Sequence, residues 1–381
     1  MTNAEVFHQL ATRYGYGGRL DREKRAGTPA GELYSAVARQ AEELIASARQ
    51  CLPRLPRIHF DFVYNGDVNA FACKENDQYF IGITSGTFVL LQLIFCRMLS
   101  DSRLLTHVGD PAGEAADLPP LAGFIPDAQR MADAGMVISR PKTEPRWLYS
   151  CHLLSQAALF IIGHEIAHIT RGHVDYLNSK TGTPILPEMG WNKSEAIALI
   201  ERQALEGDAD ARSFHARLGS MASTAAAPGL GAPSWLHTPP TLEQLVFDCA
   251  FSVNSLFRIF GDIRFAGSDL TAASYPPLPL RRAMLALSAL AAAPADHKEM
   301  TKVTLRAAIL AAESAFATIT GESMSVAGMD DAFGPEGRAH MQRLADCWHG
   351  GLRDRLAPFA FEVDREPPGF LQTMPPSYEA A

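Results

Sequence analysis

The chain lacks the features that mark several common classes of protein. It has no basic surplus, since 42 acidic residues outnumber 34 lysines and arginines and give a formal net charge of −8. A general nucleic-acid-binding protein normally carries excess positive charge, so we expect no nucleic acid as a partner. The first residues show no basic stretch followed by an apolar core, which predicts that no secretory signal peptide is present.

Long apolar runs and paired cysteines are also missing. The longest apolar runs, residues 88–95 and 157–162, fall far short of the roughly 20 residues that a membrane-spanning helix needs. We therefore expect a soluble protein without a membrane span. The six cysteines include no Cys-x-x-Cys pair, which argues against a cysteine-ligated zinc. Cys73, Cys96 and Cys151 stand in apolar surroundings typical of buried, reduced thiols, and this favours a cytoplasmic location.

What remains is the composition of a globular protein. The 381 residues are 47% hydrophobic and 20% charged, enough for one large core or two moderate ones. Helical and strand patterns together predict an α+β fold that is mostly α. We divide the chain into an N-terminal helical segment (1–55), a central domain (56–292) with an insertion at 100–146, and a C-terminal helical extension with a tail (293–381).

Secondary structure follows from periodicity and from turn residues. Three short strands, at 57–64, 68–73 and 78–84, are expected to form a meander. Residues 14–19 are expected to be a flexible turn, because no strand precedes their glycines. Residues 178–192 are interpreted as a loop and 225–240 as a linker, with a short helical candidate at 126–134 and a loose tail from 366. Longer helices are predicted at 31–50, 85–98, 147–173, 194–221, 242–260, 280–292 and 297–319.

One short run within the predicted helix 147–173 indicates a chemistry. It is His164-Glu165-Ile166-Ala167-His168. Residues four apart lie on the same face of a helix, so His164 and His168 can both bind one metal ion. Glu165 then lies beside the metal, where it can act as general base toward a metal-bound water. This is the pattern of zinc metallopeptidases, with Zn2+ as the cofactor.

The alternative is a helix with two structural histidines. His-Glu-x-x-His occurs by chance in roughly 1% of chains of this length. The apolar surroundings argue against chance, because two histidines and a glutamate are costly to bury without partners.

A second element can complete the site. Catalytic zinc usually has three protein ligands, and Glu206 is the candidate third ligand. Asp210 lies one helical turn further along and can accept a hydrogen bond from a ligand histidine. Small neighbours at Gly207, Ala209 and Ala211 would let the two helices approach closely. Taken alone, Glu206 and Asp210 fit a solvated acidic face, but the histidine motif favours the ligand interpretation.

With these residues the chain resembles the gluzincin zinc metallopeptidases, in particular the HtpX-type and CAAX-processing proteases. Three further stretches are similar to that family. His173 stands nine residues after the first histidine, residues 68–71 ahead of 80–86 resemble its Asn-Ala-Phe strand pair, and Tyr275-Pro276 followed by Arg281-Arg282 resembles its His-Pro…Arg element. The resemblance covers roughly residues 57–285. A weaker resemblance connects the chain to the soluble phage-exclusion Lit-type peptidases.

The resemblance implies a zincin-like core with a small β-sheet beside the HExxH helix. The chain departs from the family in three respects. It lacks the family's transmembrane helices, it carries the long 100–146 insertion, and Tyr275 stands where histidine is usual. Processing of membrane substrates is therefore not carried over, and a soluble protein or peptide substrate is expected.

Roles for the remaining candidates are hypotheses. Glu165 is assigned as general base and then acid. Tyr275, His215 and Arg212 are alternative donors to the oxyanion, with Tyr275 ahead, although each alone fits a structural role. His173 either supports the site or bonds to helix-end carbonyls, with Asp175 as its candidate partner. His152 is interpreted as a core or surface histidine.

The leading functional hypothesis is a soluble zinc endopeptidase. An extended substrate would add as a strand at the edge of strand 78–84 or its neighbour. Two alternatives remain, a zinc-stabilised interaction protein without activity and a zinc hydrolase of non-peptide substrates.

Overall fold

A computed structural model of the whole chain describes residues 1–121, 139–187, 197–226, 241–261, 265 and 269–362. Helices surround one small sheet, which confirms the predicted α+β, mostly α class. The strands are β1 Gly18–Arg19, β2 Ile58–Tyr64, β3 Ala70–Glu75, β4 Gln78–Thr84 and β5 Ile185–Pro187. The helices are α1 Asn3–Arg13, α2 Pro29–Cys51, α3 Ser85–Leu99, α5 Glu144–Thr170, α6 His173–Thr181, α7 Leu199–Ala226, α8 Leu242–Phe260, α9 Asp269–Ala272, α10 Leu278–Ala292, α11 Lys298–Thr320, α12 Ala327–Phe333, α13 Pro335–Cys347 and α14 Arg353–Leu356, with short turns η1 Glu23–Arg25, η2 Pro111–Gly113 and η3 Trp348–Leu352.

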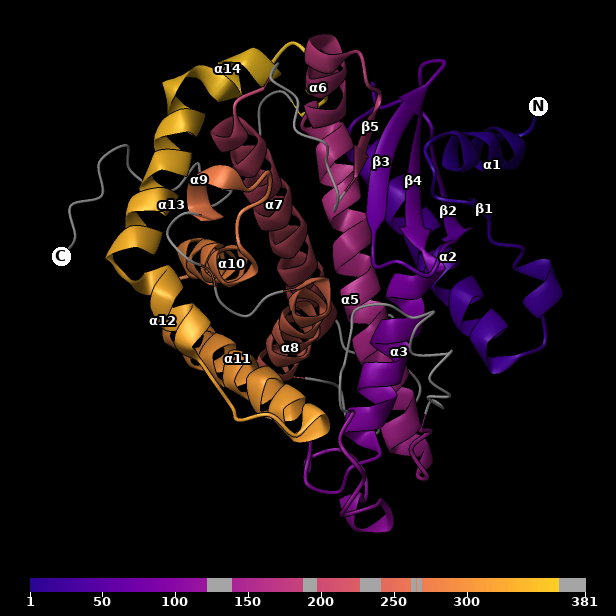
Figure 1. Cartoon of the computed structure of the whole chain (residues 1–381), viewed down its shortest axis with the longest axis vertical. Coiled ribbons are helices and arrows are strands. Elements are labelled where there is room, and N and C mark those ends of the chain that lie inside the picture. Colours follow the sequence, from indigo (N-terminus) through magenta and orange to yellow (C-terminus); the bar gives the residue numbers. More distant parts are fainter. Residues whose placement is uncertain (122–138, 188–196, 227–240, 262–264, 266–268, 363–381) are drawn as a thin grey trace.

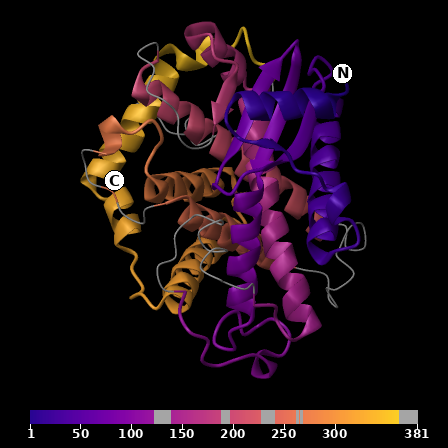
Figure 2. The same ribbon diagram turned by 45° about the vertical axis from the view of Figure 1, so that its right-hand side comes forward.

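The helix α5 is the centre of the molecule. Figure 1 shows it between the sheet with α1 and α2 and the helices α7, α8, α10 and α11, while α12–α14 form an outer rim. Both views show α3 alongside α5 (Figure 2), and the two helices pack on each other. The main core joins residues of α2, the sheet, α3, α5, α8 and α11. The division into three domains stays a prediction.

The sheet has the order β1-β2-β4-β3-β5, so the predicted meander is wrong. The three predicted strands lie close to where they were expected, as β2, β3 and β4, but β2 pairs with β4 in parallel, and β3 pairs with β4 through an antiparallel hairpin. Asn76 and Asp77 form that turn with φ of 49° and 59°, as a two-residue primed turn requires. The chain between β2 and β3 passes close under Gly86, where a Cβ would lie 2.0 Å from the carbonyl oxygen of Gly66. Alternation fixes the face of each residue, not the neighbour of each strand.

The motif helix ends earlier than predicted. α5 stops at Thr170, Gly172 adopts φ +78°, and α6 begins at His173. A side chain at Gly172 would also meet the backbone of Phe359, with a Cβ only 2.6 Å from its carbonyl carbon. The predicted loop 178–192 is partly ordered, since α6 runs to Thr181 and β5 follows. The start of the predicted helix 194–221, the helical candidate 126–134, most of the linker 225–240 and the tail 366–381 lie outside the described residues.

Two helices of the described chain are long and apolar enough to cross a membrane by length and composition. They are α5 and α11, and 83% of the most apolar stretch of α5 is buried inside the protein, against 50% for α11. α5 is surrounded by the sheet, α3, α7 and α8, so its apolar character is that of a core helix.

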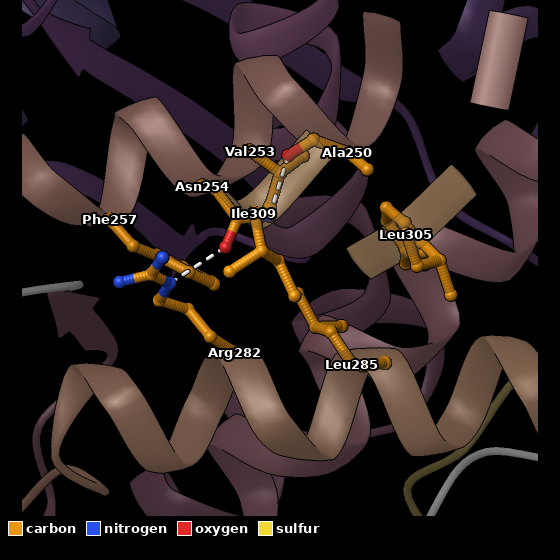
Figure 3. Close-up of a pocket in the computed structure, with 10 residues that line it drawn as sticks. Ala250, Val253, Asn254, Phe257, Arg282, Leu285, Leu305 and Ile309 are labelled. Atoms are coloured by element: carbon orange, nitrogen blue, oxygen red, sulfur yellow. Dashed lines mark hydrogen bonds between the residues drawn. The ribbon is translucent and has the colours of Figure 1, made fainter. Parts of the chain in front are cut away.

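The helical layer encloses a small cavity between α8, α10 and α11, with a volume of about 10 Å³. Figure 3 shows Arg282 donating to Asn254 at its wall, at 2.7 Å. Arg282 also pairs with Glu313 of α11 at 2.6 Å. A space of this size holds about one water molecule, so it has no room for a substrate.

Arg146, near the start of α5, organises the beginning of the 100–146 segment. Its side chain is fully buried and donates to five backbone carbonyls at the end of α3 and in the following loop, at 2.7–3.1 Å: those of Leu99, Asp101, Leu104, Leu105 and Val108. Carbonyls at a helix end need such partners when they are buried. This part of the predicted insertion is therefore anchored to the N-terminal end of the motif helix.

We predict that Arg146→Met destabilises the fold by about 3–5 kcal/mol, because several buried carbonyls lose their donor at once. Urea unfolding followed by circular dichroism measures this change. Arg103→Met is the control, since Arg103 is half exposed and binds the carboxylate of Asp101 rather than a set of backbone carbonyls, so the loss should stay below about 1 kcal/mol. Equal losses in both variants would contradict the anchoring role of Arg146.

Candidate active site

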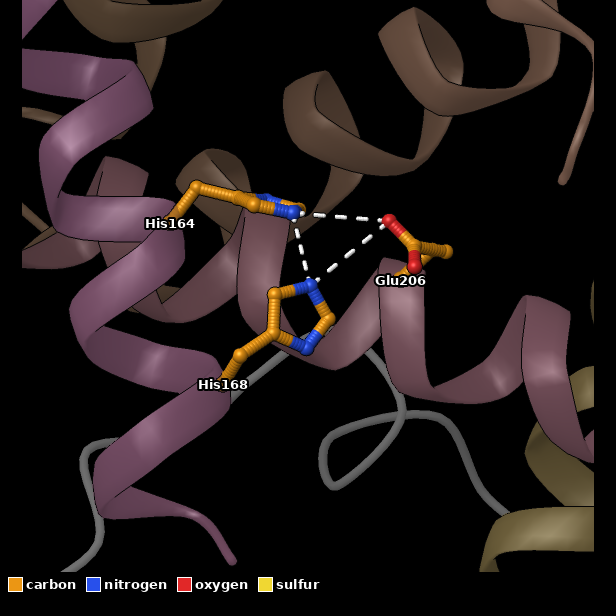
Figure 4. A group of neighbouring side chains, drawn as sticks. All are labelled: His164, His168 and Glu206. Atoms are coloured by element: carbon orange, nitrogen blue, oxygen red, sulfur yellow. Dashed lines mark hydrogen bonds and ion pairs between the residues drawn. The ribbon is translucent and has the colours of Figure 1, made fainter. Parts of the chain in front are cut away.

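Three ligand-type side chains meet between α5 and α7. The Nε2 atoms of His164 and His168 lie 2.8 Å apart, and Oε2 of Glu206 lies 3.4 Å from the first and 3.7 Å from the second. Figure 4 shows all three pointing to one place from two helices. Each residue is at most 2% exposed, so this is a buried cluster and not a solvated acidic face. The structure thus brings together the three ligand candidates predicted from the sequence.

The local geometry follows from close packing of α5 on α7. Within α5 the two histidines are one turn apart on one face. Gly163 lets α7 approach, since a Cβ there would lie 2.6 Å from Oγ of Ser213. That hydroxyl donates to the carbonyl of Phe160 at 2.7 Å and ties the two helices together. The two helices approach closely, as predicted, and the residues in contact at that point are Gly163 of α5 and Ser213 of α7.

His164 is oriented by a buried ion pair. Its Nδ1 lies 2.9 Å from Oδ1 of Asp210, as predicted, and Arg281 binds the same carboxylate with two hydrogen bonds of 2.7 and 2.8 Å. A carboxylate held by arginine only accepts hydrogen bonds, so the proton of His164 lies on Nδ1. Its Nε2 therefore directs a lone pair into the cluster.

His168 has a second histidine as its outer partner. Its Nδ1 lies 2.9 Å from Nδ1 of His173, and Nε2 of His173 lies 3.4 Å from Oδ2 of Asp208. His173 thus lies at the site, and the alternative with helix-end carbonyls does not describe its contacts. The predicted pairing of His173 with Asp175 is wrong, because Asp175 binds Lys74 and the hydroxyl of Tyr79 instead. Turning the chain at Gly172 is what brings His173 back to α5.

The electrostatics suit a cation. Burial lowers the pKa of His168 to about 3, so its imidazole is neutral at physiological pH. Burial alone raises the pKa of Glu206, but the charge of Arg202 is the largest opposing effect, and the pKa lies well below its usual value. Two imidazole nitrogens and one carboxylate form a donor set that zinc accepts.

The distances also fit a metal ion. Ligand atoms about 2.0–2.1 Å from a tetrahedral zinc lie about 3.3 Å from one another. The three observed separations of 2.8, 3.4 and 3.7 Å fall around this value. Facing lone pairs on two buried nitrogens repel each other unless a cation lies between them, so His164, His168 and Glu206 could hold one.

Glu165 lies beside the cluster and is fully buried. Burial raises the pKa of Tyr16, and the charge of Glu165 raises it further. Tyr16 is therefore a neutral hydroxyl near this carboxylate. It belongs to residues 14–19, which were expected to be a flexible turn, whereas Gly18–Arg19 form β1 and pair with β2. Nothing in the local sequence pattern indicated that this segment lies near α5.

The candidate oxyanion donors differ in position. The hydroxyl of Tyr275 donates to the carbonyl of Pro187 at 2.6 Å and lies 3.4 Å from a nitrogen of Arg202. Arg202 in turn binds Oε1 of Glu206 at 2.9 Å, so Tyr275 is two contacts from the cluster. Arg202 was not singled out from the sequence, although a cation one turn before a buried glutamate is a usable signal.

The other two candidates have partners elsewhere. His215 contacts Ser288 of α10, with Nε2 3.0 Å from its carbonyl oxygen. Arg212 binds Glu362 near the C-terminal end of the described chain, at 3.2 Å. These positions favour structural roles for both. His152 contacts Asp248 at 3.0 Å and is partly buried, between the core and surface positions that were expected.

The predicted substrate edge needs correction. β4 lies between β2 and β3, and β3 is in turn covered by β5, so β4 offers no edge. The outer strand on this side of the described sheet is β5, which the sequence did not predict. At three residues it is too short for an alternation pattern to identify it.

Removing the charge from Asp210 should weaken metal binding. We predict that Asp210→Asn lowers zinc affinity about 10- to 100-fold, because the amide no longer fixes the proton on Nδ1 of His164. Competition with a chromophoric chelator measures this. Asp248→Asn is a matched control, since it alters another buried Asp–His pair away from the cluster and should leave affinity unchanged. Equal affinities in Asp210→Asn and the parent would refute this orienting role.

Comparison with known proteins agrees with the geometry. Residues 33–186 match the family model of peptidase family M48. No curated protein and no solved structure matches the chain. The matched residues include both histidines and Glu165, whereas Glu206 lies beyond them. The match supports the zincin-like arrangement of sheet and motif helix, and it implies protein or peptide substrates. The predicted resemblance to the HtpX-type metallopeptidases is thus confirmed, and residues 33–186 are similar to peptidase family M48.

Proposed function

We propose that this protein is a soluble, zinc-dependent endopeptidase of the gluzincin type. The observation that carries the proposal is the convergence of His164, His168 and Glu206 with a buried Glu165 next to the first ligand. Zinc bound by these three side chains would act as a Lewis acid on the substrate carbonyl and lower the pKa of water to about 7.

Glu165 performs the proton transfers in this proposal. Its carboxylate takes a proton from the attacking water and delivers it to the nitrogen of the leaving amine. Burial strengthens this role, because a carboxylate away from bulk water interacts more strongly with nearby protons and charges. The C–N bond of the peptide breaks, and the products are a carboxylate and an amine.

Tyr275 remains the proposed donor to the oxyanion. Its hydroxyl is held at the carbonyl of Pro187 on β5 and stands beside Arg202, which binds Glu206. A substrate strand along β5 would therefore lie next to the donor and, through Arg202, near the ligand Glu206. We place the extended substrate at β5 rather than at β4.

A cytoplasmic location without a membrane span is part of the proposal. Six free thiols support it, and burial raises the pKa of Cys96 and of Cys249 to about 12, so both thiols stay protonated. Protonated buried thiols resist oxidation and suit a reduced protein.

The test separates metal binding from catalysis. We predict that Glu165→Gln keeps one zinc per chain but loses about 10²- to 10⁴-fold in cleavage rate, because no carboxylate remains to accept the proton. His164→Ala should lose both the cleavage activity and the bound zinc. A quenched peptide library reports cleavage and atomic absorption reports zinc.

Cleavage by Glu165→Gln at the parental rate would sink the mechanism. The alternative, a zinc-stabilised interaction protein, predicts that chelation lowers the melting temperature while neither the parent nor any variant cuts a peptide.

A further inference from the structure

We propose that His173 and Asp208 are positioning residues for the ligand His168, and that Glu362 of the C-terminal segment completes this arm. The inference rests on the proposed zinc site, and it adds the segment that controls one of the ligands. We call the five residues His168, His173, Asp208, Arg171 and Glu362 the C-terminal arm.

The arm is a continuous row of buried contacts. The Nδ1 atoms of His168 and His173 lie 2.9 Å apart, and Nε2 of His173 lies 3.4 Å from Oδ2 of Asp208. Arg171 binds both oxygens of Asp208, at 2.7 and 3.1 Å, and its Nη1 lies 3.7 Å from Oε2 of Glu362. Each of these side chains is at most 8% exposed.

The row favours one placement of the protons. Asp208 is bound by Arg171 and can only accept, so it favours the proton of His173 on Nε2. Nδ1 of His173 is then an acceptor, and the short contact requires the proton of His168 on Nδ1. The lone pair of His168 is consequently on Nε2, the nitrogen that faces His164 and Glu206.

The residues after α14 pack against the other residues of the C-terminal arm. The amide of Phe361 donates to the carbonyl of Thr170 at 2.9 Å, and Phe359 packs against Gly172, at the turn that places His173. Glu362 is bound by Arg212 at 3.2 Å as well as facing Arg171. Two arginines and two carboxylates thus balance their charge across α5, α7 and the C-terminal segment.

The two histidine ligands therefore differ in their support. His164 depends on Asp210 and Arg281. His168 depends on His173 and Asp208 and, through Arg171, on Glu362, which lies far outside the matched residues 33–186. Metal binding and docking of the C-terminal segment should consequently stabilise each other, because linkage between two sites is reciprocal.

The experiment measures zinc affinity of the full chain by chelator competition. Asp208→Asn should weaken zinc binding about 10- to 100-fold, and Glu362→Gln should weaken it several-fold. His173→Phe keeps a ring of similar size without nitrogens and guards against a folding defect in Asp208→Asn; it should weaken binding at least 10-fold. Melting temperatures of the apo forms show that each variant is folded.

The reciprocal readout does not involve activity. Zinc added to the parent chain should slow hydrogen exchange at the amide of Phe361 about 10-fold, and Glu362→Gln should abolish this protection. Glu201→Gln is the matched control, because Glu201 also ties α7 to α14 through Arg355 but has no contact with the arm. It should leave both readouts unchanged.

The outcomes separate this inference from the proposed function. A parent chain that binds no zinc refutes the zinc site and the arm with it. A parent that binds zinc and cleaves peptides, while folded His173→Phe and Glu362→Gln bind zinc as tightly as the parent, refutes the arm alone.

Discussion

The structure depends on one demanding contact, two neutral imidazole nitrogens held 2.8 Å apart in the interior. Nothing in that contact is favourable by itself, because each nitrogen directs a lone pair at the other. The surroundings impose it, with an anion behind His164, a histidine behind His168, and Gly163 drawing α7 against α5. These contacts hold the three ligand side chains in the arrangement that a cation requires, which is preorganisation in the usual sense.

The residues that assemble the site come from helices that are distant in sequence. α5 and α7 supply the ligands, α10 supplies Arg281, and the segment after α14 supplies Glu362. Buried charge requires such partners, since an uncompensated carboxylate in the interior would be protonated instead. The family model, which ends at residue 186, thus covers the two histidines and Glu165, while Glu206 and the residues that orient the histidines include later parts of the chain.

The sequence predicted what depends on short-range periodicity and spacing. Three of the five described strands, most helices, and the pairs His164 with His168 and Glu206 with Asp210 follow from residues within one or two turns of each other. The order of strands, the place of Tyr16 and the roles of Asp208 and Arg202 depend on contacts between segments that no local pattern encodes. Asp208 shows the difficulty well. It stands between two residues that were singled out, yet its partner His173 becomes visible only once the chain has turned.

That turn changes what the spacing between two histidines means. On an unbroken helix with about 100° per residue, a side chain five positions after His168 would point about 140° away from it. Because the helix stops at Gly172, the same spacing delivers an imidazole to the back of the ligand. The number of residues between His168 and His173 is therefore set by the turn of the chain at Gly172 and not by the helical repeat. A single inserted residue in this stretch would leave every side chain of the motif present and its geometry lost.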